Sequence, residues 1–200
     1  MTAGELFHLL LPRISKMPAG DEFLNGLNNA ILVITRRLLY RKSSLIKSGF
    51  RGSVRANTSG ISLPDGYLGF CPDAPPTIAG KTLLPLPPFK YGSYSAAGSP
   101  EYYDTRSGRI NLYPTPADAI VITALYFQKP DRLTSPDDEL PWEGIIDDLI
   151  GEAVIAISRT GQWGSITAEW EALISREVDR LASTYASRVA EFVPVNLIAR

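Results

Sequence analysis

The sequence predicts an α+β protein: two N-terminal and two C-terminal helices form one bundle, with a β-rich insertion between them and an extended C-terminal tail. Three observations support this fold. Apolar residues recur at helical spacing near both ends, Gly, Pro, Ser and aromatic residues dominate the middle, and Pro194 follows the last helical stretch. We therefore divide the chain into residues 1–44, 45–130, 131–192 and 193–200.

The first helix opens with a capping box. Thr2 and Glu5 have the S/T-x-x-E spacing that satisfies two free backbone donors at a helix start. Pro12 predicts a kink or a break, because proline removes a helical hydrogen bond.

The second helix has Asp21 as its expected N-cap and should end near Ser43 or Ser44. Basic residues crowd its last turns, where they favour the negative end of the helix dipole. Its apolar residues recur at steps of one, three and four: Phe23, Leu24, Leu27, Ile31, Ile34 and Leu38.

The insertion shows two strand patterns. Residues 109–113 alternate polar and apolar side chains, and residues 120–127 are β-branched and aromatic. We expect these two strands to pair through residues 114–118. A strand at residues 101–104 should turn back into the first one, and residues 72–98 are read as an extended loop.

Helix returns after Pro141 and breaks at Gly161 and Gly164. An acidic, proline-containing linker precedes it, over residues 131–139. The last helix is expected to start near Ser165 or Thr167.

Composition indicates a globular protein with a real core. Hydrophobic residues make up 44% and charged residues 20% of the 200 residues. No apolar run approaches the roughly 20 residues of a membrane span. The single cysteine, Cys71, excludes an internal disulfide and fits a reducing compartment.

Charge is distributed unevenly along the chain. Residues 1–60 carry nine Lys/Arg and three Asp/Glu, a net charge of +6. Residues 131–200 carry six Lys/Arg and thirteen Asp/Glu, a net charge of −7. The two ends could complement each other, within one molecule or between neighbours in a ring, or they could be two solvated surfaces of opposite sign.

The sequence contains few of the residue combinations that catalysis requires. His8 is the only histidine and Cys71 has no partner, which excludes the usual zinc sites and leaves a nucleophilic triad only one candidate base. Asp147 and Asp148 are adjacent on a helix and point in different directions. No phosphate-binding glycine loop occurs. We therefore expect a non-enzymatic protein without a metal or cofactor.

Two charged groups are candidate assembly surfaces. A basic face could meet an inter-subunit partner or the phosphates in a DNA channel: Arg36, Arg37, Arg41, Lys42 and Lys47. An acidic face could meet a neighbouring subunit: Asp147, Asp148 and Glu152.

Several short phrases, taken in order, resemble one known family. They are Leu27-Asn-Asn-Ala, the turn Leu63-Pro-Asp-Gly, Leu112-Tyr-Pro-Thr-Pro, the strand closing on Tyr126-Phe-Gln-Lys-Pro, and Leu140-Pro-Trp followed by Asp148-Leu-Ile. This order is similar to that of the head-to-tail adaptor proteins of tailed phages.

The resemblance implies a structural virion protein of the neck, made in the host cytoplasm. It implies a homo-oligomeric ring, commonly of twelve copies, that lines the DNA exit channel and contacts both the portal protein and a tail or nozzle protein. In such proteins the C-terminal segment extends into the portal. The matching residues here are Val193, Pro194, Val195, Asn196, Leu197, Ile198 and Arg200.

A binding module is the alternative function. Tyrosines suit carbohydrate or peptide contacts when they are exposed, although tyrosines in sheets are commonly buried. Under this hypothesis the insertion would bind its ligand through Tyr91, Tyr94, Tyr102 and Tyr103.

Overall fold

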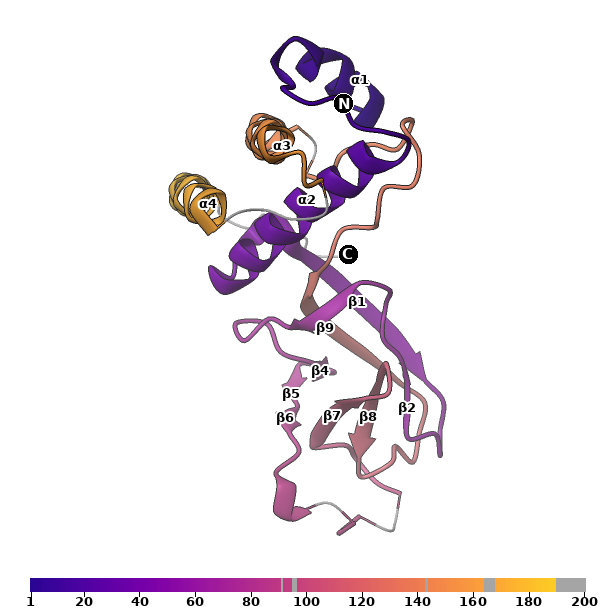
Figure 1. The fold of residues 1–200 in the computed structure, drawn as a ribbon. Helices are drawn as coiled ribbons and strands as arrows, with labels where there is room; N and C mark the ends of the chain where they lie inside the picture. The colour runs from indigo at the N-terminus through magenta and orange to yellow at the C-terminus, as the bar shows by residue number, and fades with distance from the viewer. Residues whose placement is uncertain (91, 95–96, 143, 164–167, 190–200) are drawn as a thin grey trace, which may run out of the picture. The chain divides into compact units, whose positions relative to one another are not determined.

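The computed structural model describes residues 1–90, 92–94, 97–142, 144–163 and 168–189. These residues form an α+β fold with four α-helices and two β-sheets (Figure 1). Two compact units result. The helical unit comprises Met1–Ile46 and the described residues from Pro130 onward, and the β-rich unit comprises Lys47–Lys129.

Helices from both ends of the chain pack together in the helical unit. They are α1 (Ala3–Leu10), α2 (Glu22–Tyr40), α3 (Asp147–Thr160) and α4 (Ala168–Val189). α2 contacts both α3 and α4, which lie on the same side of it (Figure 1). The core side chains come from all four helices and include Leu6, Leu10, Leu27, Ile34, Leu38, Ile150, Val154, Ile157, Ile174 and Val178.

Local signals fix most helix ends. The capping box is confirmed, because Glu5 N–H donates to Thr2 Oγ1 at 3.1 Å and Thr2 N–H to Glu5 Oε2 at 2.8 Å. The break at Pro12 is also confirmed, since α1 gives way to a 3₁₀ turn at Leu11–Arg13. Asp21 occupies the N-cap position of α2, but its side chain makes no capping bond.

The C-terminal ends of α2 and α3 use left-handed residues. α2 stops three residues before the predicted Ser43, where Lys42 has φ +51° and Ser43 N–H donates to the Leu38 carbonyl at 3.0 Å. A Schellman ending has two backbone hydrogen bonds, and this is the one that joins residues farther apart in the sequence. α3 ends at Gly161 with φ +67°, as the sequence predicts.

The five-stranded sheet is organised around one long strand, β9 (Ile120–Gln128). On one side β9 pairs antiparallel with β1 (Lys47–Val54) over eight residues. On the other side it pairs with β3 (Tyr67–Phe70) and β4 (Thr77–Ile78), and β4 pairs with β5 (Lys81–Thr82).

The four-stranded sheet has the order β2 (Gly60–Ser62), β8 (Arg109–Tyr113), β7 (Tyr102–Arg106) and β6 (Leu84–Pro85). The predicted β7–β8 hairpin is confirmed, with Arg106 opposite Arg109. Its two loop residues, Ser107 and Gly108, both have positive φ, as the favoured two-residue hairpin turn requires.

The predicted pairing of residues 109–113 with 120–127 is wrong. β8 and β9 belong to different sheets. The residues that connect them bond to other segments: Thr115 O accepts from Gly98 N–H and Pro116 O accepts from Asn57 N–H, both at 2.8 Å. Both edges of β9 are meanwhile occupied by β1 on one side and by β3 and β4 on the other.

Side chains from both sheets share one core. It contains Phe50, Val54, Leu83, Ile110, Leu112, Ile122 and Tyr126. The stretch 72–98, expected to be an extended loop, supplies the short strands β4, β5 and β6 and the 3₁₀ turn Pro88–Lys90. Strands of two residues leave too little alternation in the sequence to reveal them.

Candidate assembly surfaces

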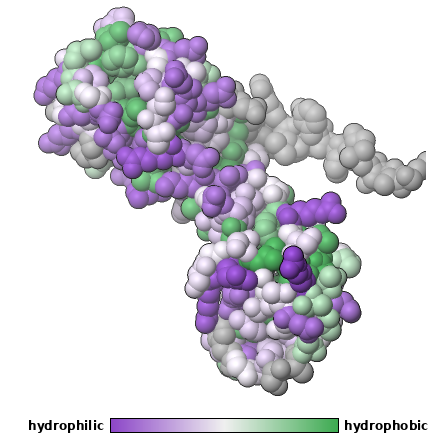
Figure 2. All heavy atoms as spheres, turned by 90° about the vertical axis from the view of Figure 1, so that its right-hand side faces the viewer, coloured by the Kyte–Doolittle hydropathy of each residue, from purple (hydrophilic) through white to green (hydrophobic). Residues whose placement is uncertain are grey.

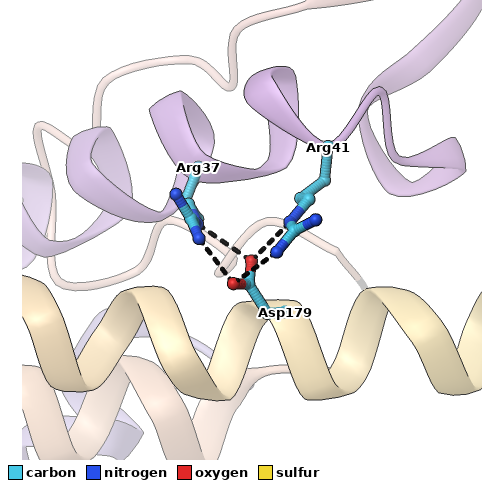
Figure 3. A network of polar contacts seen from close by, with 3 residues as sticks. All are labelled: Arg37, Arg41 and Asp179. Carbon is cyan, nitrogen blue, oxygen red and sulfur yellow. Dashed lines mark hydrogen bonds and ion pairs between the residues drawn. The ribbon is translucent and has the colours of Figure 1, made fainter.

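An arginine clamp joins α2 to α4 in the helical unit (Figure 3). Arg37 donates to Asp179 through Nε at 2.9 Å and Nη2 at 2.5 Å, and Arg41 does so through the same two atoms at 2.7 Å each. The two arginines are four residues apart, so they lie on one face of α2. One carboxylate therefore receives two bidentate pairs from a helix about 140 residues earlier in the chain.

The clamp shifts the ionisation of all three groups toward the charged state. Hydrogen bonds from Arg41 and Arg37 hold the pKa of Asp179 far below its usual range. The same bonds raise the pKa of Arg37 and of Arg41. Both guanidinium groups also flank the ring of Tyr40, at 5.1 and 5.9 Å from its centroid.

The predicted basic face is therefore divided. Arg37 and Arg41 are engaged in the clamp, and Lys47 lies in the β-rich unit, where its Nζ donates to Asp73 at 2.8 Å. Arg36 and Lys42 are exposed. Within the described part of the chain, neither side chain forms a hydrogen bond or an ion pair.

The predicted acidic face is divided too. Asp147 is only 6% exposed, burial raises its pKa, and its Oδ1 has no hydrogen-bond partner among the described residues. Glu152 accepts from Arg13 at 2.6 Å. Asp148 is exposed, and no ion pair holds it among the residues that the structure describes.

A groove of about 260 Å³ adjoins this acidic region in the helical unit. Residues before and in α3 and on α4 line it: Ile145, Ile146, Asp148, Leu149, Glu152, Glu177 and Arg180. The lining combines apolar side chains with three carboxylates. Glu177 pairs with Arg180 at 2.8 Å and Glu152 with Arg13, so Asp148 is the carboxylate in this described lining left without an ion pair.

The tyrosines of the β-rich unit have two different roles. The Tyr94 ring is tilted relative to those of Tyr102 and Tyr113, with ring centroids 6.0 and 6.2 Å away, and Lys90 Nζ donates to the Tyr102 hydroxyl at 2.6 Å. Tyr103 instead packs against the core, and burial raises its pKa. Tyr91 and the predicted docking tail, residues 193–200, lie outside the described residues.

The described residues show little that could perform catalysis. They contain no cluster of metal-ligating side chains. Cys71 is buried, and burial raises the pKa of its thiol, which disfavours the nucleophilic thiolate. On both units, hydrophobic side chains reach the surface between hydrophilic ones (Figure 2).

Sequence reasoning missed Asp179 as the partner of Arg37 and Arg41. The spacing of the two arginines indicates a shared face, but nothing in the sequence selects one of the many later carboxylates. It also missed the groove, since its lining comes from segments on two sides of a helix break.

Comparison with known protein families gives a match over nearly the whole chain. The family model of the SU10 adaptor protein matches residues 1–195. The chain belongs to the SU10 adaptor protein family. This is a family of phage head–tail adaptors, so the resemblance inferred from the sequence is confirmed.

Family membership makes the chain a structural component of a phage virion that interacts with other head and tail proteins. Such adaptors are typically non-enzymatic, and the match gives no support to the alternative of a carbohydrate- or peptide-binding module. No curated protein matches the sequence. Among the described helices, none has the length and apolar character needed to cross a membrane.

Proposed function

We propose that the protein assembles into a ring of twelve copies that joins the capsid portal to the tail and lines the DNA exit channel. The family match carries this proposal, because it covers residues 1–195 and thus both compact units. A ring of identical subunits needs two different, complementary surfaces on each copy. Exposed charges of both signs lack ion pairs in the described part of the helical unit, among them Arg36 and Asp148, and they support that requirement.

A channel surface would come from the basic residues that internal ion pairs leave available. The β-rich unit carries eight Lys/Arg and five Asp/Glu, a net charge of +3. In that unit Arg51 and Arg55 are exposed, and neither side chain has a partner among the described residues. Contacts of this kind to passing DNA would be independent of base sequence and would weaken with salt.

Imaging tests the ring. The full-length protein should form rings in negative-stain images, either alone or after mixing with the portal protein of the same phage. A protein that stays monomeric under both conditions contradicts the proposal.

Residues 193–200 are proposed as the portal-docking tail. Pro194 disfavours helix, and Val195, Leu197 and Ile198 offer apolar side chains to a partner. Deleting the segment should weaken portal binding about tenfold or more, because a handful of apolar anchors usually carries most of a binding energy. The matched control replaces residues 193–200 with a Gly/Ser segment of the same length. Unchanged portal binding by both variants would contradict the tail's role.

A further inference from the structure

The solvent side of α2 carries a half-exposed apolar stripe. Val33, Arg36, Leu39 and Tyr40 recur at steps of three and four and so share one helix face. This face is opposite to the one formed by Ile34 and Leu38, which are buried against the rest of the unit. Tyr40 is 72% exposed, and Val33 and Leu39 are partly exposed. We call these four residues the α2 stripe.

The linker after the β-rich unit is bonded to the other half of α2. Asn28 accepts from Leu133 N–H at 2.9 Å and donates to the Leu133 carbonyl at 2.9 Å, and Arg132 donates to Asn25 at 3.0 Å. These bonds end about one turn before Val33. The α2 stripe thus has no described hydrogen bond to the linker, and its one cation has no pairing partner among the described residues.

The groove beside α3 and α4 has matching chemistry. Its apolar side chains are Ile145, which is 36% exposed, and Leu149. Leu173, which is 38% exposed, extends the apolar surface because it lies one turn before Glu177 on the same face of α4. Asp148 stands in this described lining as an unpaired carboxylate. We call this surface the α3–α4 groove.

The two surfaces complement each other in charge. Each combines an apolar strip with one charge that has no ion pair among the described residues, positive on the α2 stripe and negative in the α3–α4 groove. An amphipathic helix laid into an apolar groove is a common mode of recognition. Docking would also pair Arg36 with Asp148, so that neither charge is left unpaired as water is excluded.

We propose that the α2 stripe of one copy docks into the α3–α4 groove of the next copy, with Arg36 facing Asp148. This inference rests on the proposed ring and names its interface within the helical unit. α3 and α4 pack against α2, and the buried residues Ile34 and Leu38 lie on the helix face opposite to the centre of the stripe. One copy therefore presents stripe and groove on different sides, which is the head-to-tail arrangement that closes a ring.

Charge reversal in the full-length protein tests the interface. Arg36→Glu and Asp148→Arg should each reduce ring formation by about tenfold or more, since like charges then face each other. An equal mixture of the two single variants should restore rings. In a ring that alternates the two variants, the two reversed charges face each other at one interface, and the native Arg36 and Asp148 face each other at the next. The double variant should assemble as well, because opposite charges then meet at every interface.

The controls separate folding from assembly. Asp118→Lys reverses an exposed charge of the β-rich unit that has no role in the proposed interface or channel, and it should leave ring formation unchanged. Circular dichroism should show wild-type helicity for every variant. Leu39→Cys and Ile145→Cys add a readout that keeps both charges, because a thiol crosslinker should join these two variants in a mixture but should not join either to itself.

Different failures have different meanings. If the wild type forms no ring alone or with the portal protein, the proposed function fails, and this inference fails with it. If rings form and the single charge reversals do not weaken them, the interface alone is overturned. If Arg36→Glu forms normal rings that no longer bind the portal, the interface is likewise overturned, and the α2 stripe contacts the portal instead of a second copy.

Discussion

The two units differ in how the chain builds them. The β-rich unit is one continuous stretch, Lys47–Lys129, with strands joined largely by short turns. The helical unit combines two segments separated by that stretch, and its clamp joins residues about 140 positions apart. The continuous unit owes its structure to turns and to a shared sheet core, whereas the helical unit exists only when both ends of the chain meet.

Separating the units should give the largest effect. A fragment of residues 47–129 should fold alone and unfold cooperatively, because its core lies within the fragment. Residues 1–46 alone should lose most of their helical signal in circular dichroism, since isolated helices are marginal in water. Adding residues 130–200 to residues 1–46 should restore helicity. A well-folded 1–46 fragment would remove the distinction between the units.

Truncating apolar side chains of the β-rich unit to alanine should destabilise it at buried positions and have little effect at exposed ones. Leu112 is fully buried, so Leu112→Ala should lower the free energy of unfolding by about 2–5 kcal/mol. Phe89 is 81% exposed, and Phe89→Ala should change the free energy of unfolding by less than about 0.5 kcal/mol. Urea denaturation of both variants measures the contrast. Equal losses would show that Phe89 contributes to the fold.

The clamp predicts a smaller effect, confined to the helical unit. Asp179→Asn removes the charge that Arg37 and Arg41 share and should lower the Tm of that unit by roughly 2–4 °C. Because the pKa of Asp179 is lowered in the folded state, its contribution is present at neutral pH and is lost as pH falls through that lowered pKa. Thermal scans in low and high salt should show a larger difference in low salt.

Replacing Asp147 should have the smallest effect on stability, and it should stabilise the protein where replacing Asp179 destabilises it. Burial raises the pKa of Asp147, so in the pH range between the unfolded-state pKa and this raised pKa the folded chain holds a proton that the unfolded chain has released. Stability from this group therefore increases as pH falls through the raised pKa. Asp147→Asn should stabilise the protein at pH 7 by up to about 1 kcal/mol, with the advantage shrinking at lower pH. Denaturation at several pH values measures this, and an advantage that grew on acidification would contradict it.

Sequence reasoning was most successful where the signal is local. The Thr2–Glu5 capping box, the break at Pro12, the Ser107-Gly108 turn and the Gly161 helix end each depend on a few adjacent residues. It failed at β8 and β9, which are adjacent in the chain but lie in separate sheets. Their partners are set by distant segments that compete for the same strand edges.

The sequence by itself determined the four helices, the β7–β8 hairpin, the strand at residues 120–127 and the resemblance to phage head–tail adaptors. Only the tertiary structure decided which charges are free. It assigns Arg37 and Arg41 to Asp179, buries Asp147, and leaves Arg36 and Asp148 without ion pairs in the described part of the chain. The reason is physical: an ion pair depends on distance in space, and distant segments gain that proximity only by folding.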